Sequence, residues 1–118
     1  MNNTKAFITG STALESATAD SDVDLVMLVN EHTKALLIEA SDLAKLPCRF
    51  GKLNLILCTS HEEYSLWLAS LNRCQTEQEK ASRKLDRDER LAIHVETFKS
   101  FGWDNYFNKE LFSGGDDA

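Results

Sequence analysis

The chain has 118 residues, enough for one domain with a single hydrophobic core, and its hydrophobic fraction of 42% and charged fraction of 27% are typical of a globular protein. Its net charge of −6 argues against strong general binding of nucleic acid, whose phosphates attract basic proteins. No apolar run approaches the ~20 residues needed to cross a bilayer, and the polar start of the chain is not a signal peptide.

The first informative stretch is a Gly-Ser turn, Gly10-Ser11, between two predicted elements. These are a strand at residues 5–9 and a short helix at 12–16. Thr12 and Glu15 fit a capping box for that helix. Glycine lets the backbone approach a ligand closely, and a helix start offers free N–H groups to an anion. The turn therefore predicts contact with phosphate.

The second stretch is a predicted strand at residues 22–29, which begins with two aspartates. Because side chains alternate along a strand, Asp22 and Asp24 should share one face, with Val23 and Leu25 on the other. Two close carboxylates repel each other unless a cation or a proton lies between them. Oxygen ligands suit Mg²⁺, which also binds substrate phosphates. Asp22 and Asp24 are thus predicted metal ligands.

The rest of the chain alternates between helices and strands. The predicted elements are a helix at 31–46 ended by a proline, a strand at 49–59, a capped helix that starts after Ser60, a helix at 76–101 with a break near 86–89, and a short closing helix that begins at Trp103. Strands that alternate with helices indicate an α/β sandwich.

The pattern Gly10-Ser11, ten residues, then Asp22-Val23-Asp24 resembles the signature of minimal members of the DNA polymerase β-like nucleotidyltransferase superfamily. The resemblance implies a nucleotidyltransferase-fold mixed sheet flanked by helices, followed by a C-terminal helical segment. We expect a single domain over residues 1–118. Its predicted parts are an α/β core at 1–71, a helical segment at 72–112 and a disordered tail at 113–118.

The resemblance also implies a chemistry. Asp22 and Asp24 would hold Mg²⁺ or Mn²⁺ and act as catalytic residues, while Gly10 and Ser11 would bind the β and γ phosphates of an NTP substrate. The product would be a nucleoside monophosphate on a hydroxyl of a protein or small-molecule acceptor, with release of pyrophosphate. Small relatives include antitoxins that modify a toxin, so a small helical protein is an expected partner.

Two positions depart from the family pattern. Asn54 occupies the place of a third catalytic carboxylate, and an asparagine offers a carbonyl oxygen but neither a charge nor a proton-accepting group. Thr12 stands where many minimal members carry an arginine near the phosphates. A catalytically impaired binding module, antitoxin-like or regulatory, is therefore the alternative to an active transferase.

A calcium loop is a weaker interpretation of the aspartates. Asp20, Asp22, Asp24 and Glu31 fall at the ligand positions of an EF-hand, but Leu25 stands where that loop needs glycine. In a purely structural interpretation, Asp22 caps a turn and Asp24 is solvated at a strand end. The transferase pattern explains the Gly-Ser spacing, which neither of these interpretations does.

Two other groups of residues receive structural interpretations. A helical face that carries Lys80, Arg83, Lys84 and Arg87 could line the cleft, but nearby acidic residues favour a solvated face. The three cysteines are odd in number and lack metal-type spacing, which predicts reduced thiols and a cytoplasmic location.

Overall fold

The computed structural model describes residues 5–42, 47–81 and 84–103. In chain order the elements are β1 (Lys5–Thr9), α1 (Gly10–Ala13), β2 (Val23–Leu28), α2 (Glu31–Ala40), β3 (Cys48–Phe50), β4 (Leu53–Cys58), α3 (His61–Lys80) and α4 (Arg87–Ser100). The predicted closing helix, apart from Trp103, and the predicted tail lie outside the described residues. None of the described helices is long and apolar enough to cross a membrane.

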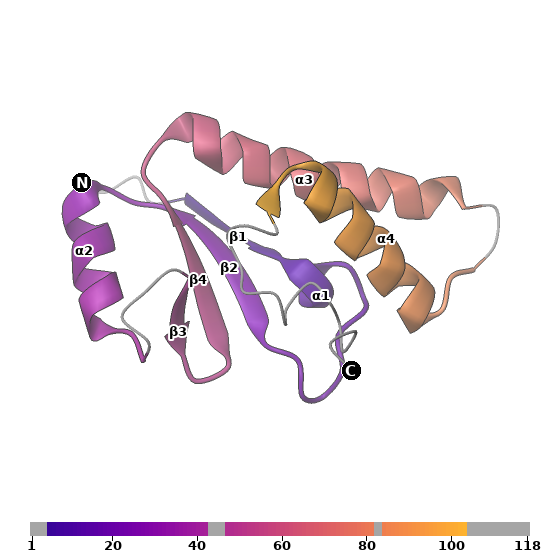
Figure 1. The fold of residues 1–118 in the computed structure, drawn as a ribbon, viewed down its shortest axis with the longest axis horizontal. Helices are drawn as coiled ribbons and strands as arrows, with labels where there is room; N and C mark the ends of the chain where they lie inside the picture. The colour runs from indigo at the N-terminus through magenta and orange to yellow at the C-terminus, as the bar shows by residue number, and fades with distance from the viewer. Residues whose placement is uncertain (1–4, 43–46, 82–83, 104–118) are drawn as a thin grey trace.

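The strands form one mixed sheet in the order β1-β2-β4-β3 (Figure 1). The two central strands, β2 and β4, run parallel, whereas β1 and β3 pair with them antiparallel at the edges. A parallel pair needs a crossover connection, and here α2 and β3 lie in it. This mixed sheet with flanking helices confirms the predicted α/β class.

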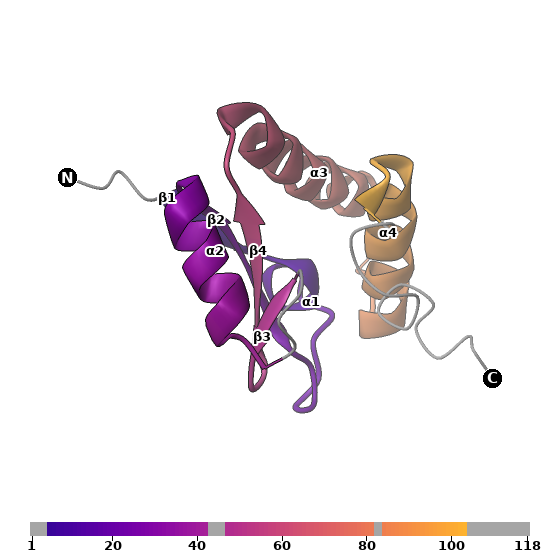
Figure 2. The same ribbon diagram turned by 60° about the vertical axis from the view of Figure 1, so that its left-hand side comes forward.

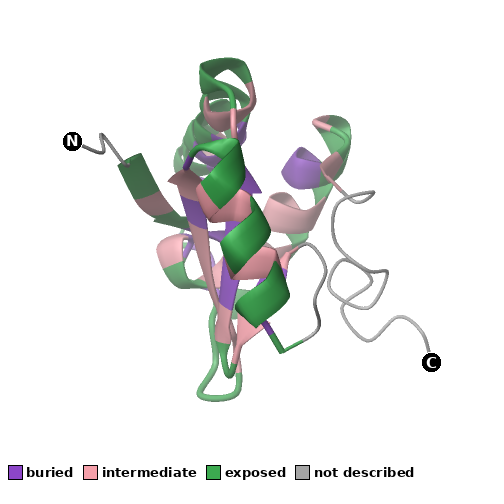
Figure 3. Cartoon of the chain, turned by 90° about the vertical axis from the view of Figure 1, so that its left-hand side faces the viewer, coloured by how far each residue is buried: buried purple, intermediate pink, exposed green. Residues whose placement is uncertain are grey.

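Helices cover both faces of the sheet (Figures 1 and 2). α2 packs on one face, and α1, α3 and α4 lie on the other. Because side chains alternate along a strand, β4 directs Leu55 and Leu57 toward α2 and directs Ile56 and Cys58 toward α3. Figure 3 shows α2 with its exposed outer side in front of the more buried strands.

Aromatic contacts join α3 and α4 on the α3 face of the sheet. Trp67 is fully buried, and its ring stacks on Trp103 with a centroid separation of 4.0 Å and an interplanar angle of 7°. Phe98 of α4 lies 6.2 Å from the Trp67 ring, between centroids. Aromatic pairs of this kind add to the free energy of burial. They fix α4 at a defined place relative to the sheet.

The strand predicted at residues 49–59 is in fact two strands, β3 and β4, so that prediction was wrong. They form a hairpin whose two-residue turn is Gly51-Lys52, and Gly51 has φ +64°. A glycine in this left-handed region allows the tight turn. The hairpin places β3 at the edge of the sheet, with Arg49 opposite Asn54.

Two helices differ from their predicted lengths. α2 ends at Ala40, because Ser41 is extended and its hydroxyl donates to the Ile38 carbonyl at 2.9 Å. The helix was predicted to continue to residue 46, and residues 43–46 lie outside the described ranges. α3 continues to Lys80, although the sequence suggested a change after Asn72.

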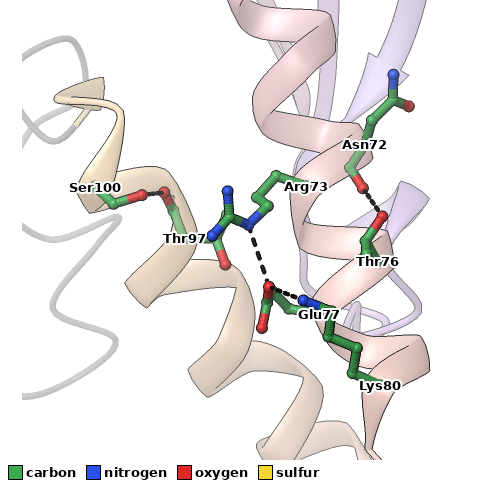
Figure 4. Close-up of polar contacts among 7 residues, drawn as sticks. All are labelled: Asn72, Arg73, Thr76, Glu77, Lys80, Thr97 and Ser100. Carbon is green, nitrogen blue, oxygen red and sulfur yellow. Dashed lines mark hydrogen bonds and ion pairs between the residues drawn. The ribbon is translucent and has the colours of Figure 1, made fainter.

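Polar residues along the second half of α3 contact one another within the helix (Figure 4). Glu77 accepts hydrogen bonds from Arg73 at 3.1 Å and from Lys80 at 3.3 Å, which are neighbours on one helical face. Thr76 donates its hydroxyl to the Asn72 carbonyl at 2.9 Å, so its hydrogen bond stays within the helix. The predicted break between helices is present, but earlier, because α3 ends at Lys80 and a capping box of Asp86 and Glu89 starts α4.

Candidate functional site

The Gly-Ser turn lies directly against the second aspartate. Gly10 follows β1 with φ +70°, and a Cβ atom at this position would lie 2.3 Å from Oδ2 of Asp24. Any side chain here would therefore both strain the backbone and displace that carboxylate. The helix that follows differs from its prediction, because α1 is a single turn that begins at Gly10 and no side chain caps it. The capping box predicted from Thr12 and Glu15 was wrong.

The sheet register brings the aspartates to this turn. Asp24 pairs with Thr9, the last residue of β1, and Asp22 lies just before β2. Asp22, Asp24, Gly10 and Ser11 all line one pocket with a volume of about 310 Å³. The structure thus brings together four of the five site residues predicted from the sequence. Their chemical roles remain predictions.

The pocket has a polar side and a helical side. The polar side comes from the end of β1, the start of β2 and the segment between them: Thr9, Gly10, Ser11, Ser16, Thr18, Asp20, Ser21, Asp22 and Asp24. The helical side comes from α3 and α4: Trp67, Arg87, Leu91, His94, Val95 and Phe98. Its size is at the lower end of the range typical of small-molecule pockets, and it combines apolar lining with convergent polar groups.

The α4 side of the pocket was not predicted from the sequence. The spacing of the apolar residues Leu91, Val95 and Phe98 in the sequence is typical of a buried helical face, but it does not indicate which surface that face meets. Arg87 lines the pocket, although the basic face to which it belongs was interpreted as solvated. Its guanidinium also contacts Asp88 at 2.8 Å, and its side chain is 48% exposed.

His94 is a buried titratable group on this side. Burial lowers its pKa from 6.5 to about 4, so the ring is neutral at pH 7. The ring meets Phe98 edge-on, with centroids 4.7 Å apart, and its Nδ1 has no hydrogen-bond partner among the described residues. A neutral imidazole on this apolar wall can accept a hydrogen bond from a ligand or donate one to it.

Asp24 is the most perturbed carboxyl group of the pocket. Burial raises its pKa from 3.8 to about 6. The hydrogen bond from Asn54 and the charge of Arg49 lower the pKa, whereas the charge of Asp22 raises it further. Perturbed carboxyl groups of this kind in a pocket are common at functional sites. A cation beside Asp24 would favour its ionised form.

Asn54 lies behind Asp24 rather than at the pocket surface. It is 2% exposed, it is not a lining residue, and it faces Asp24 across the parallel β2–β4 pair. Its Nδ2 donates to Oδ1 of Asp24 at 3.1 Å, and its Oδ1 accepts from Nε of Arg49 at 3.2 Å. Arg49 in turn forms an ion pair with Asp22. The sequence did not indicate this role for Arg49.

A comparison with protein families identifies the family of the chain. The family model for the nucleotidyltransferase domain matches residues 1–108. The chain belongs to this family. This match confirms the predicted family and the predicted fold class, and it supports a general function in nucleotidyl transfer. Comparisons with curated proteins and with solved structures gave no significant match.

The donor set of this nucleotidyltransferase domain fits one oxygen-ligated divalent cation. Asp22 and Asp24 offer carboxylate oxygens to the same pocket, which is a ligand type that Mg²⁺ and Mn²⁺ accept. In residues 5–42, 47–81 and 84–103, no group of three or more His, Cys, Asp or Glu side chains is arranged to hold a metal ion. Since the Asn54 oxygen faces Arg49, it supplies no third ligand.

Proposed function

We propose that this domain binds a nucleoside triphosphate together with Mg²⁺ or Mn²⁺ and transfers its nucleoside monophosphate to a hydroxyl group of a protein or small-molecule acceptor. The acceptor oxygen forms a bond to the α-phosphorus, the bond between that phosphorus and the bridging oxygen breaks, and pyrophosphate leaves while the hydroxyl proton passes to water. The close packing of Gly10 against Asp24 in one pocket is the observation that carries the proposal.

The proposal gives a role to four of the predicted site residues. The Gly10-Ser11 backbone can approach the β and γ phosphates because no Cβ atom blocks it at Gly10. Asp22 and Asp24 would hold the cation, which supplies charge neutralisation of the phosphates when bound. Phosphoryl transfer depends mainly on positioning and on such neutralisation. The apolar side chains of α4 offer a surface for the flat face of a base or ribose.

The direct test is incubation of the purified protein with each labelled NTP and Mg²⁺ or Mn²⁺, alone and in lysate. Label should move from the NTP to an acceptor, and Asp24→Ala should abolish the transfer. Glu96→Gln is a matched control, because this acidic side chain is exposed on α4 and does not line the pocket. Transfer that is unchanged in Asp24→Ala would contradict the proposal.

A second candidate is a binding module that has lost turnover, and the contacts of Asn54 favour it. Two-metal transfer uses one cation to prepare the attacking hydroxyl, and the neutral Asn54 side chain is already occupied by Arg49 and Asp24. In this case NTP with metal raises the melting temperature but no labelled product forms. Asn54→Asp should then create activity. If Asn54→Asp changes nothing while Asp24→Ala abolishes native transfer, our interpretation of Asn54 is wrong.

For the acceptor, we favour a small helical protein partner, as in antitoxins that modify a toxin. The resemblance to minimal family members supports this choice. A cytoplasmic location is consistent with free, buried Cys48, Cys58 and Cys74. Mass spectrometry of proteins that gain a nucleoside monophosphate in the labelled lysate would identify the acceptor.

A further inference from the structure

Four polar side chains form a continuous chain of contacts at the pocket: Asp22, Arg49, Asn54 and Asp24. Because Arg49 and Asn54 bridge the two aspartates, we name this group of four residues the bridged carboxylate pair. Three neighbouring strands supply Asp24, Asn54 and Arg49 at one level, and Asp22 lies just before β2. Asp24 lies opposite Asn54 on β2 and β4, and Asn54 lies opposite Arg49 on β4 and β3. Residues that face each other across paired strands share a face of the sheet, so their side chains meet.

The orientation of the amide in this chain follows from hydrogen-bond chemistry. Arginine only donates hydrogen bonds, so the side chain of Asn54 must turn its oxygen toward Arg49. Its NH₂ group then faces Asp24, whose carboxylate accepts. The asparagine thus links a cation to one carboxylate, while the same guanidinium binds the other carboxylate directly, at Asp22.

This arrangement places a permanent positive charge beside the two carboxylates. Arginine stays protonated at any accessible pH, and its planar group can bind two acceptors at once. Arg49 therefore reduces the repulsion that would otherwise require a cation between Asp22 and Asp24. It also binds Oδ2 of Asp22, one of the two carboxylates that are predicted to hold a metal ion.

We propose that Arg49 is a built-in counter-ion of the bridged carboxylate pair. Its charge takes the place of a second divalent cation, and its guanidinium competes with the one bound divalent cation for the carboxylate of Asp22. This positioning residue limits the site to one divalent ion and lowers the affinity for it. The inference rests on the proposed function, because it concerns the same cation site. It adds a residue that lies outside the Gly-Ser and Asp-x-Asp pattern.

The test is a titration with Mn²⁺, followed by the electron paramagnetic resonance signal of the free ion, with and without NTP. Wild-type protein should bind one Mn²⁺. Arg49→Gln removes the charge and should raise the Mn²⁺ affinity about tenfold or more, since a neighbouring unit charge is lost. Arg49→Lys keeps the charge and should bind like the wild type. Arg49→Gln combined with Asn54→Asp should bind a second ion.

Arg73→Gln is the matched control, because Arg73 also pairs with a carboxylate, Glu77, at 3.1 Å but lies on α3 outside the pocket. Its Mn²⁺ affinity should equal that of the wild type. An unchanged or weaker affinity in Arg49→Gln, with normal binding by the wild type, would overturn the counter-ion role alone. Absence of Mn²⁺ and NTP binding in every variant would overturn the proposed function as well.

A measurement on the wild-type protein covers the case in which Arg49→Gln does not fold. Nuclear magnetic resonance can follow the Nη2–H signal of Arg49, the nitrogen that contacts Asp22, during titration with Mg²⁺. The inference predicts that this signal shifts in step with ion binding, as the guanidinium leaves Asp22. A signal that stays fixed while the carboxyl carbons of Asp22 and Asp24 shift would contradict the competition.

Discussion

Asp24→Asn tests the energetic cost of holding an acidic group in this pocket. The substitution keeps the size of the side chain, and its Oδ1 can still accept the hydrogen bond from Asn54. What it removes is the charge. Because burial raises the pKa of Asp24 from 3.8 to about 6, the folded protein binds more protons than the unfolded chain between these pH values.

The sign and size of the effect follow from this difference. Where the folded state binds more protons, the free energy of unfolding falls as the pH rises. At roughly 1.4 kcal/mol per pH unit, a rise of the pKa from 3.8 to about 6 corresponds to about 3 kcal/mol at most. The wild type should therefore lose about 2 to 3 kcal/mol relative to Asp24→Asn between pH 4 and pH 8.

Urea unfolding of both proteins in EDTA, over this pH range, measures the difference directly. Titrating groups that lie far from Asp24 contribute nearly equally to both proteins and cancel in the comparison. Mg²⁺ added at high pH should recover part of the loss in the wild type and none in Asp24→Asn. A difference that is independent of pH, or that grows in favour of the wild type as pH rises, would refute the reasoning.

Three further substitutions test other parts of the account. Gly10→Ala should destabilise the fold by about 1 to 3 kcal/mol more than Gly51→Ala in urea unfolding. Both glycines have positive φ, but only a Cβ atom at position 10 would meet Asp24, and equal losses of stability would contradict this. His94→Leu should become more stable relative to the wild type as pH falls from 6.5 toward 4, where the buried ring must become charged; a flat pH profile in thermal melts would contradict this. Asp86→Ala should cost about 1 kcal/mol by loss of the α4 cap, and an unchanged urea midpoint would show that the cap is dispensable.

The local patterns in the sequence predicted much of the fold and of the site. β1 has the predicted bounds, since an apolar run that ends in glycine defines a short strand well. Alternation along β2 correctly placed Asp22 and Asp24 on one side, and the Gly10-Ser11 turn lies beside them. These are features that a few neighbouring residues determine.

Contacts between distant segments could not be predicted in this way. Arg49 reaches Asp22 because Gly51 turns the chain between β3 and β4, and the sequence was interpreted there as one strand. The contribution of α4 to the pocket has a similar cause. The apolar spacing of Leu91 and Val95 indicates burial, but the tertiary packing decides which surface they cover.

The most direct test of the acidic pair facing the Gly-Ser turn is calorimetric titration of the protein with each common NTP in Mg²⁺ and in EDTA. We predict binding that requires the divalent ion and is lost in Asp24→Asn, while cooperative urea unfolding of the variant shows that it is folded. Binding of equal strength in EDTA, or in Asp24→Asn, would contradict the assignment of this pocket as the nucleotide site.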